Sequence, residues 1–189
     1  MIDYSQPDFY RFNSDSLDLV KWVASKNLNT QRLLDLGSGS GVIGLEYHQL
    51  RPVKELILLE VQDEFLYHLK KNSEGTVAQI FHGSFSQFYP DKPFDLILCN
   101  PPYYLPGTGE VSQNPNRHMA RTFIRDNWDE LLGCVERSLS QEGFCFMVIK
   151  DNKLLCEMAS KNSSLKLTIH KIQKGLLFLE LTRLNVERA

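Results

Sequence analysis

The chain has 189 residues, a formal net charge of -2 at pH 7, and 42% hydrophobic and 23% charged residues. This length supports one buried core, and the charge excludes a globally basic surface as the basis of nucleic-acid binding. No apolar stretch reaches the ~18 residues that a membrane helix needs, and residues 1–12 lack the basic start and apolar centre of a signal peptide. We therefore expect a cytoplasmic protein that contacts RNA or DNA only through a local patch or a partner.

Short apolar runs alternate with segments of helical spacing along the chain. The runs at 32–37, 55–61, 77–83, 95–100 and 143–150 predict strands covered on both faces, and helical periodicity follows at 41–50, 62–74 and 128–141. Two further strand-like runs, 165–172 and 176–184, flank a glycine-containing turn, which is a hairpin signal. The order predicts an α/β fold: a Rossmann-like, doubly wound, mostly parallel seven-stranded sheet with a C-terminal antiparallel hairpin, in one domain over 1–189.

The cysteines give no sign of a metal site. Their spacing contains no C-x-x-C pair, and their contexts are apolar or helical, which favours reduced, buried thiols without a metal. The four are Cys99, Cys134, Cys145 and Cys156.

A glycine-rich loop, LLDLGSGSGVIG at 33–44, follows the first predicted strand and opens a helix. Its spacing fits G-x-G-x-x-G, in which glycines allow close approach of a ligand to the backbone and free helix N–H groups bind polar groups. Asp35 stands where a carboxylate repels a pyrophosphate but can bind an ammonium or hydroxyl group. Glu60, at the end of the next strand, is placed to hold ribose hydroxyls. A ligand with a ribose, an ammonium and no phosphate suits both acids, and S-adenosylmethionine is such a ligand.

The stretch NPPYYLPGTG at 100–109 follows the predicted strand at 95–100. Ligands of open α/β sheets bind beyond the carboxyl ends of the strands, so this stretch lies at the ligand-binding edge. The Asn100 side-chain carbonyl and the Pro101 backbone carbonyl can accept both hydrogens of an –NH₂ group. Tyr103 offers a flat face for stacking a planar base or amide. The pattern predicts methyl transfer from the sulfonium to an amine, a displacement that depends mainly on positioning.

Together, DLGSGSG, Glu60 and NPPY make the chain resemble a class I S-adenosylmethionine-dependent methyltransferase of the small-domain type, in the branch that methylates adenine amines or glutamine amides. Two further stretches, FYRFNSDSLDLVKW at 9–22 and the segment from RHMAR at 117–121 to the strand at 143–150, resemble the tRNA(Val) adenine-N6-methyltransferases. The resemblance implies S-adenosylmethionine as methyl donor, S-adenosylhomocysteine as product and tRNA as the substrate.

The resemblance also assigns roles to residues of this chain. Residues 1–30 would cover the cofactor, with Asn13 and Asp15 closing over it. Asn100, Pro101, Pro102 and Tyr103 would hold the target amine. The other cofactor-binding residues would be Asp35, Gly37, Ser38, Gly39, Gly41, Glu60 and Val61. Relatives carry an acid near the adenine ring after the third strand, whereas this chain has HGSFSQF at 82–88, where Ser84 or the Phe85 backbone N–H would take that role.

Substrate contacts are expected just after NPPY. Tyr104 is adjacent to it, and Arg117, Arg121 and Arg125 recur every four residues, so a helix there would present them on one face toward phosphates or as a solvated surface paired with acids. The chain is shorter than the relatives and shows no separate RNA-binding module, which leaves open a protein partner that supplies RNA-binding surface.

Two alternatives remain open at this point. A protein glutamine amide of the release-factor type suits the NPPY chemistry as well as adenine does. A non-catalytic binding subunit with the methyltransferase fold is the other, although such a subunit has no chemical need for Asn100.

Overall fold

The computed structural model describes residues 3–102, 115–116, 126–150, 164–173 and 175–184. Within them, seven strands form one sheet in the order β3-β2-β1-β4-β5-β7-β6. The strands are β1 (Arg32–Leu36), β2 (Glu55–Glu60), β3 (Ala78–His82), β4 (Phe94–Cys99), β5 (Leu139–Lys150), β6 (Leu165–Gln173) and β7 (Leu176–Arg183). The first five pair in parallel, whereas β7 is antiparallel to both β5 and β6. The predicted fold is confirmed, including the C-terminal hairpin.

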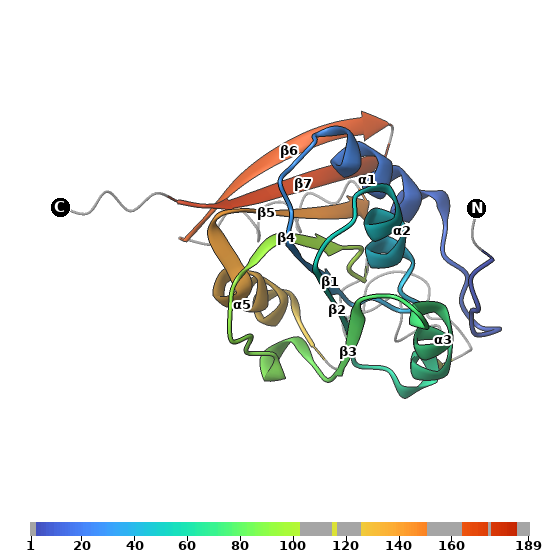
Figure 1. Cartoon of the computed structure of the whole chain (residues 1–189). Helices are drawn as coiled ribbons and strands as arrows, with labels where there is room; N and C mark the ends of the chain where they lie inside the picture. The colour runs from blue at the N-terminus through green and yellow to red at the C-terminus, as the bar shows by residue number, and fades with distance from the viewer. Residues whose placement is uncertain (1–2, 103–114, 117–125, 151–163, 174, 185–189) are drawn as a thin grey trace.

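Helices cover both faces of the sheet (Figure 1). On one face lie α1 (Ser14–Ser25), α2 (Val42–Leu50) and α3 (Asp63–Ser73), and α5 (Trp128–Ser138) lies on the other with the short 3₁₀ turn η1 (Phe85–Gln87). Strand residues alternate between two cores: Leu33 and Leu58 pack under α1, α2 and α3, and Leu34 and Leu59 pack toward α5. Burial on both faces explains why the strands read as continuous apolar runs.

One detail differs from the pattern in the sequence. β5 begins at Leu139, directly after α5, and not at residue 143. Its pairing with β4 shifts register between Phe94 and Leu96, so the strand continues through Gln141 and Glu142, which are exposed. Polar, exposed residues hide this start from a search for apolar runs.

The described cysteines, Cys99, Cys134 and Cys145, are buried and free, and Cys156 lies outside the described residues.

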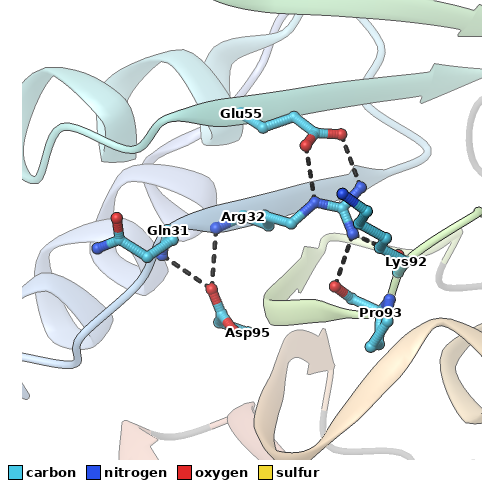
Figure 2. Close-up of polar contacts among 6 residues, drawn as sticks. All are labelled: Gln31, Arg32, Glu55, Lys92, Pro93 and Asp95. Carbon is cyan, nitrogen blue, oxygen red and sulfur yellow. Dashed lines mark hydrogen bonds and ion pairs between the residues drawn. The ribbon is translucent and has the colours of Figure 1, made fainter.

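The amino ends of the central strands are joined by a polar cluster (Figure 2). Arg32 on β1 donates to both carboxylate oxygens of Glu55 on β2, each at 2.7 Å, and to the Pro93 carbonyl before β4 at 2.7 Å. The Asp95 carboxylate accepts from the Gln31 and Arg32 backbone N–H groups, both at 2.9 Å. These contacts fix the amino ends of β1, β2 and β4 relative to one another. The carboxyl ends of the same strands lie at the opposite edge of the sheet.

Candidate functional site

A cleft opens at the carboxyl edge of the sheet between β1 and β4. β1 pairs with β2 on one side and with β4 on the other, so the strand order reverses between β1 and β4. Open α/β sheets bind their ligands at such a point. The cleft measures about 360 Å³, including its space open to solvent. Its walls are the N-terminal segment, the loop after β1 and the end of β4: Gln6, Tyr10, Phe12, Ser16, Gly37, Ser38, Ser40, Val42, Ile43 and Asn100.

The loop after β1 is a tight turn made by left-handed glycines. Gly37 and Gly39 have φ values of +67° and +55°, a region that side chains rarely adopt. Ser38 N–H donates to the Leu59 carbonyl at 2.9 Å, which ties the loop to the end of β2. Gly41 also has a positive φ, +82°, and a Cβ there would in addition lie only 2.8 Å from Leu69 Cδ1. It lets α2 pack closely against its neighbours.

Glu60 is the last residue of β2, and its carboxylate accepts hydrogen bonds from the backbone of this loop and of the residues after β2. Its Oε2 accepts from Gly39 N–H at 2.7 Å, and its Oε1 accepts from Val61 N–H and Gln62 N–H at 2.9 and 2.8 Å. Burial raises the pKa of Glu60, and the three N–H groups oppose that rise. Glu60 is only 4% exposed and, like Asp35, does not line the cleft, so in this structure its contacts are to the loop backbone.

Asp35 lies below the start of α2 and does not line the cleft. It is fully buried, and its Oδ2 accepts from Gly44 N–H at 2.8 Å, which satisfies a free donor of the helix N-terminus. Its Oδ1 finds no partner among the described residues. Burial raises the pKa of Asp35 to about 7, with the charge of Glu60 acting in the same direction.

Asn100 follows β4 and faces the loop across the cleft. Its side-chain Nδ2 donates to Ser16 Oγ on α1 at 2.9 Å. Its Oδ1 is buried and has no hydrogen-bond partner within the described part of the chain. Pro101 is buried and Pro102 partly exposed, whereas Tyr103 and Tyr104 lie outside the described residues. The amide therefore presents an acceptor that the described residues do not use.

The N-terminal segment is attached over the cleft by α3. Asn72 Nδ2 donates to the Ser5 and Ser40 carbonyls, at 2.9 and 2.8 Å, and its Oδ1 accepts from Ser5 N–H at 2.9 Å. One side chain thus joins the segment to the glycine loop. The rings of Phe9 and Tyr10 meet Phe65 edge-on, with centroids 5.5 and 5.6 Å apart.

Of the N-terminal residues proposed from the resemblance, Asn13 and Asp15 hydrogen-bond to each other at 2.9 Å and do not line the cleft. Gln6, Tyr10, Phe12 and Ser16 line it instead, and the sequence reading did not select them. Phe12 and Ser16 belong to the same FNSDSL element, so the sequence located the element but not its inward-facing residues.

The polar groups of the segment after β3 find partners within the protein. Phe85 N–H donates to Asp126 Oδ1 at 3.1 Å, so this donor is already used within the protein. Ser84 Oγ is bonded to Ser86 Oγ at 2.9 Å and to Gln87 Oε1 at 3.1 Å and remains partly exposed. Asp126 supplies an acid to this segment from forty-one residues further along the chain, which sequence spacing alone does not reveal.

Arg117, Arg121 and Arg125 lie outside the described residues, so their arrangement stays a prediction. No group of three or more His, Cys, Asp or Glu side chains in the described ranges is arranged to hold a metal ion. Among those same residues, no helix has the length and apolar character to cross a membrane.

The donor set fits S-adenosylmethionine. Two buried hydroxyls of the glycine loop, Ser38 Oγ and Ser40 Oγ, have no partner among the described residues, and both residues line the cleft with Asn100. Unpartnered buried hydroxyls are uncommon and suit the polar amino-acid end of that molecule.

Comparison with known proteins identifies the family of the chain. The family model described as methyltransferase small domain matches residues 12–171. The chain is 28% identical over 149 residues to the tRNA1(Val) (adenine(37)-N6)-methyltransferase of Shewanella sp. (strain W3-18-1), covering 72% of this chain and 59% of the relative. It is 29% identical over 157 residues to the protein of the same name from Pedobacter heparinus, covering 79% and 64%. The chain thus spans less than two thirds of the length of these relatives.

Among solved structures, the ribosomal protein L11 methylase of Lactobacillus delbrueckii subsp. bulgaricus is similar in fold, with a TM-score of 0.66 at 18% identity over 92% of this chain and 80% of that one. The TehB-like SAM-dependent methyltransferase of Corynebacterium glutamicum has a TM-score of 0.62 at 15% identity, over 88% and 87%.

The fold is the one that these solved methyltransferases share. More particularly, the chain belongs to the methyltransferase small-domain family, and its cofactor is S-adenosylmethionine.

Proposed function

We propose that this protein transfers a methyl group from S-adenosylmethionine to an exocyclic amine, and that the amine is N6 of an adenine in tRNA. The observation that carries the proposal is the buried, unpartnered Oδ1 of Asn100, a residue that lines one cleft with the glycine loop. The names of the relatives at 28–29% identity support tRNA adenine as the target.

The roles of the chain's own residues follow from this arrangement. Bound S-adenosylmethionine supplies an electrophilic methyl on a sulfonium. Asn100 Oδ1 and the Pro101 carbonyl accept the two amine hydrogens, which orients the nitrogen lone pair toward the methyl and adds electron density to it. After transfer the nitrogen releases one proton to solvent. The hydroxyls of Ser38 and Ser40 would hold the amino-acid end of the cofactor, and Glu60, which fixes the loop, would hold the ribose as the resemblance implies.

Tyr103 and Tyr104 would stack on the target base, and Arg117 and Arg121 would contact phosphates. An adenine in a stacked anticodon loop must leave the stack to reach Asn100. A partner protein that adds RNA-binding surface is consistent with the net charge of -2, which offers little non-specific attraction to RNA.

The test uses purified protein, radiolabelled S-adenosylmethionine, tRNA from cells that lack the modification, and a protein extract in parallel. We expect label in tRNA that nucleoside mass spectrometry identifies as N6-methyladenosine. Label in protein alone would instead favour a glutamine amide. Binding of S-adenosylhomocysteine without transfer to either pool would contradict the proposal and favour a non-catalytic subunit.

A further inference from the structure

A serine of helix α1 makes a direct hydrogen bond to the asparagine side chain of the NPPY motif. Ser16 Oγ accepts from Asn100 Nδ2 at 2.9 Å, across 84 positions of sequence. Ser16 is only 4% exposed, and it lines the same cleft as Asn100. This contact lies between two elements that the sequence assigned to different tasks, cofactor covering and amine binding.

An asparagine amide has two ends with opposite hydrogen-bonding character. A half-turn of the amide exchanges the carbonyl for two N–H donors. With the carbonyl facing the amine, the amine hydrogens are accepted. With the amide N–H groups facing the amine, these N–H groups would instead donate to the nitrogen lone pair that must attack the methyl. The activity therefore depends on which end Asn100 presents.

The structure places the carbonyl end free and the nitrogen end on Ser16. The Ser16 hydroxyl could bond either end of the amide, so it anchors the side chain, and the buried surroundings select the end. In the reversed orientation the buried end without a partner would be an N–H group, which proteins tolerate less readily than an under-satisfied carbonyl. Ser16 is itself held firmly because α1 packs into the core through Leu19, Val20 and Val23, each at most 1% exposed.

We propose that Ser16 is a positioning residue that anchors the nitrogen end of the Asn100 amide and so holds its carbonyl available for the target amine; this rests on the function proposed above. Ser16 does not touch the reacting atoms in this role. The N-terminal helix thus completes the amine-binding end of the site in addition to any part it plays in covering the cofactor.

The test compares Ser16→Ala with Ser16→Thr, which keeps the hydroxyl, and with Ser14→Ala, an exposed serine on the same helix. Two readouts are needed. One is the solvent exchange of the Asn100 side-chain NH₂ protons by NMR, assigned from their absence in Asn100→Ala. The other is steady-state methyl transfer together with S-adenosylhomocysteine affinity by calorimetry.

We expect Ser16→Ala to speed exchange of the Asn100 NH₂ protons and to lower kcat by roughly tenfold or more, with cofactor affinity within about twofold of the parent. Ser16→Thr should recover most of the kcat, and Ser14→Ala should change neither readout.

Several outcomes would overturn the inference. Unprotected Asn100 NH₂ protons in the parent protein would remove the hydrogen bond on which it depends, even if Ser16→Ala does not fold. An unchanged kcat in folded Ser16→Ala would remove the positioning role. A loss confined to cofactor affinity would make Ser16 a cofactor contact. If the parent protein transfers no methyl group, the proposed function fails, while the exchange measurement still decides the Ser16–Asn100 bond.

Discussion

The Gly39 backbone N–H donates to Glu60 Oε2 at 2.7 Å, which joins the loop after β1 to the last residue of β2. One buried carboxylate therefore shapes the loop whose residues Gly37, Ser38 and Ser40 line the cleft. The loop and the acid act as a unit, and a change at Glu60 affects both.

Glu60→Gln should weaken binding of S-adenosylhomocysteine by about tenfold to a hundredfold. The amide replaces one acceptor oxygen by a donor that opposes the backbone N–H groups now bonded there, and hydrogen bonds to charged groups contribute about 1.5–3 kcal/mol each. Isothermal titration calorimetry measures the loss. The control is Glu64→Gln, an exposed acid on α3; equal affinities in both variants would contradict the role of Glu60.

Asn100→Ala should lower methyl transfer by about a hundredfold or more while cofactor affinity stays nearly intact. The variant removes the acceptor that favours the amine in its reactive orientation but leaves the glycine loop and Glu60 in place. Single-turnover transfer and calorimetry on the same preparation separate the two effects. Asn29→Ala, at an exposed asparagine before β1, is the matched control. Full activity in Asn100→Ala would refute the proposed amine site.

Asp35 gives the fold a pH dependence of defined sign. Its pKa is about 7 in the folded protein, against the ordinary value of 3.8, so the folded state binds more protons between these values and stability from this group falls as pH rises from about 4 to 7. Asp35→Asn removes that loss. We expect the stability of this variant relative to the parent to increase between pH 5 and pH 8, measured by urea unfolding. Asp8→Asn, at an exposed carboxylate, should show no such trend.

Gly41→Ala and Gly75→Ala separate steric from backbone costs. Both glycines have positive φ, +82° and +74°, so each substitution carries backbone strain of roughly 1–2 kcal/mol. Only at Gly41 would the new Cβ also meet side chains, with Leu69 Cδ1 at 2.8 Å, whereas nothing lies within 4 Å at Gly75. Thermal unfolding should show the larger loss for Gly41→Ala. Equal losses would mean that the leucines around Gly41 move aside without cost.

Arg32→Met should lower the free energy of unfolding by roughly 1–3 kcal/mol without changing cofactor affinity. It removes the bonds to Glu55 and Pro93 but keeps an apolar stem near Phe94, whose ring centroid lies 4.6 Å from the guanidinium carbon. The cluster lies at the amino edge of the sheet, opposite the cleft. Lys21→Met, at an exposed site, is the control. A large loss of cofactor affinity in folded Arg32→Met would show that the two edges are coupled.

Much of the architecture is determined by local sequence. Strands buried on both faces must be apolar throughout, so β1, β2 and β4 can be recognised as continuous apolar runs in the sequence. The helices α2, α3 and α5 can be recognised from their helical periodicity. The DLGSGSG loop, Glu60 and Asn100 come at strand ends, and parallel strands carry their ends to one edge. That rule predicts the edge at which the cleft lies.

Tertiary structure decided what the local pattern does not encode. Ser16 meets Asn100, Asn72 joins the N-terminal segment to the glycine loop, and Asp126 takes the Phe85 N–H. Each pair is far apart in sequence, and a polar residue's partner depends on how helices pack on the sheet, which periodicity does not specify. The sequence by itself determined the fold, the cofactor and the edge that holds the site. Only the packed structure decided which side chains line the cleft and which oxygen of Asn100 is left to accept a hydrogen bond.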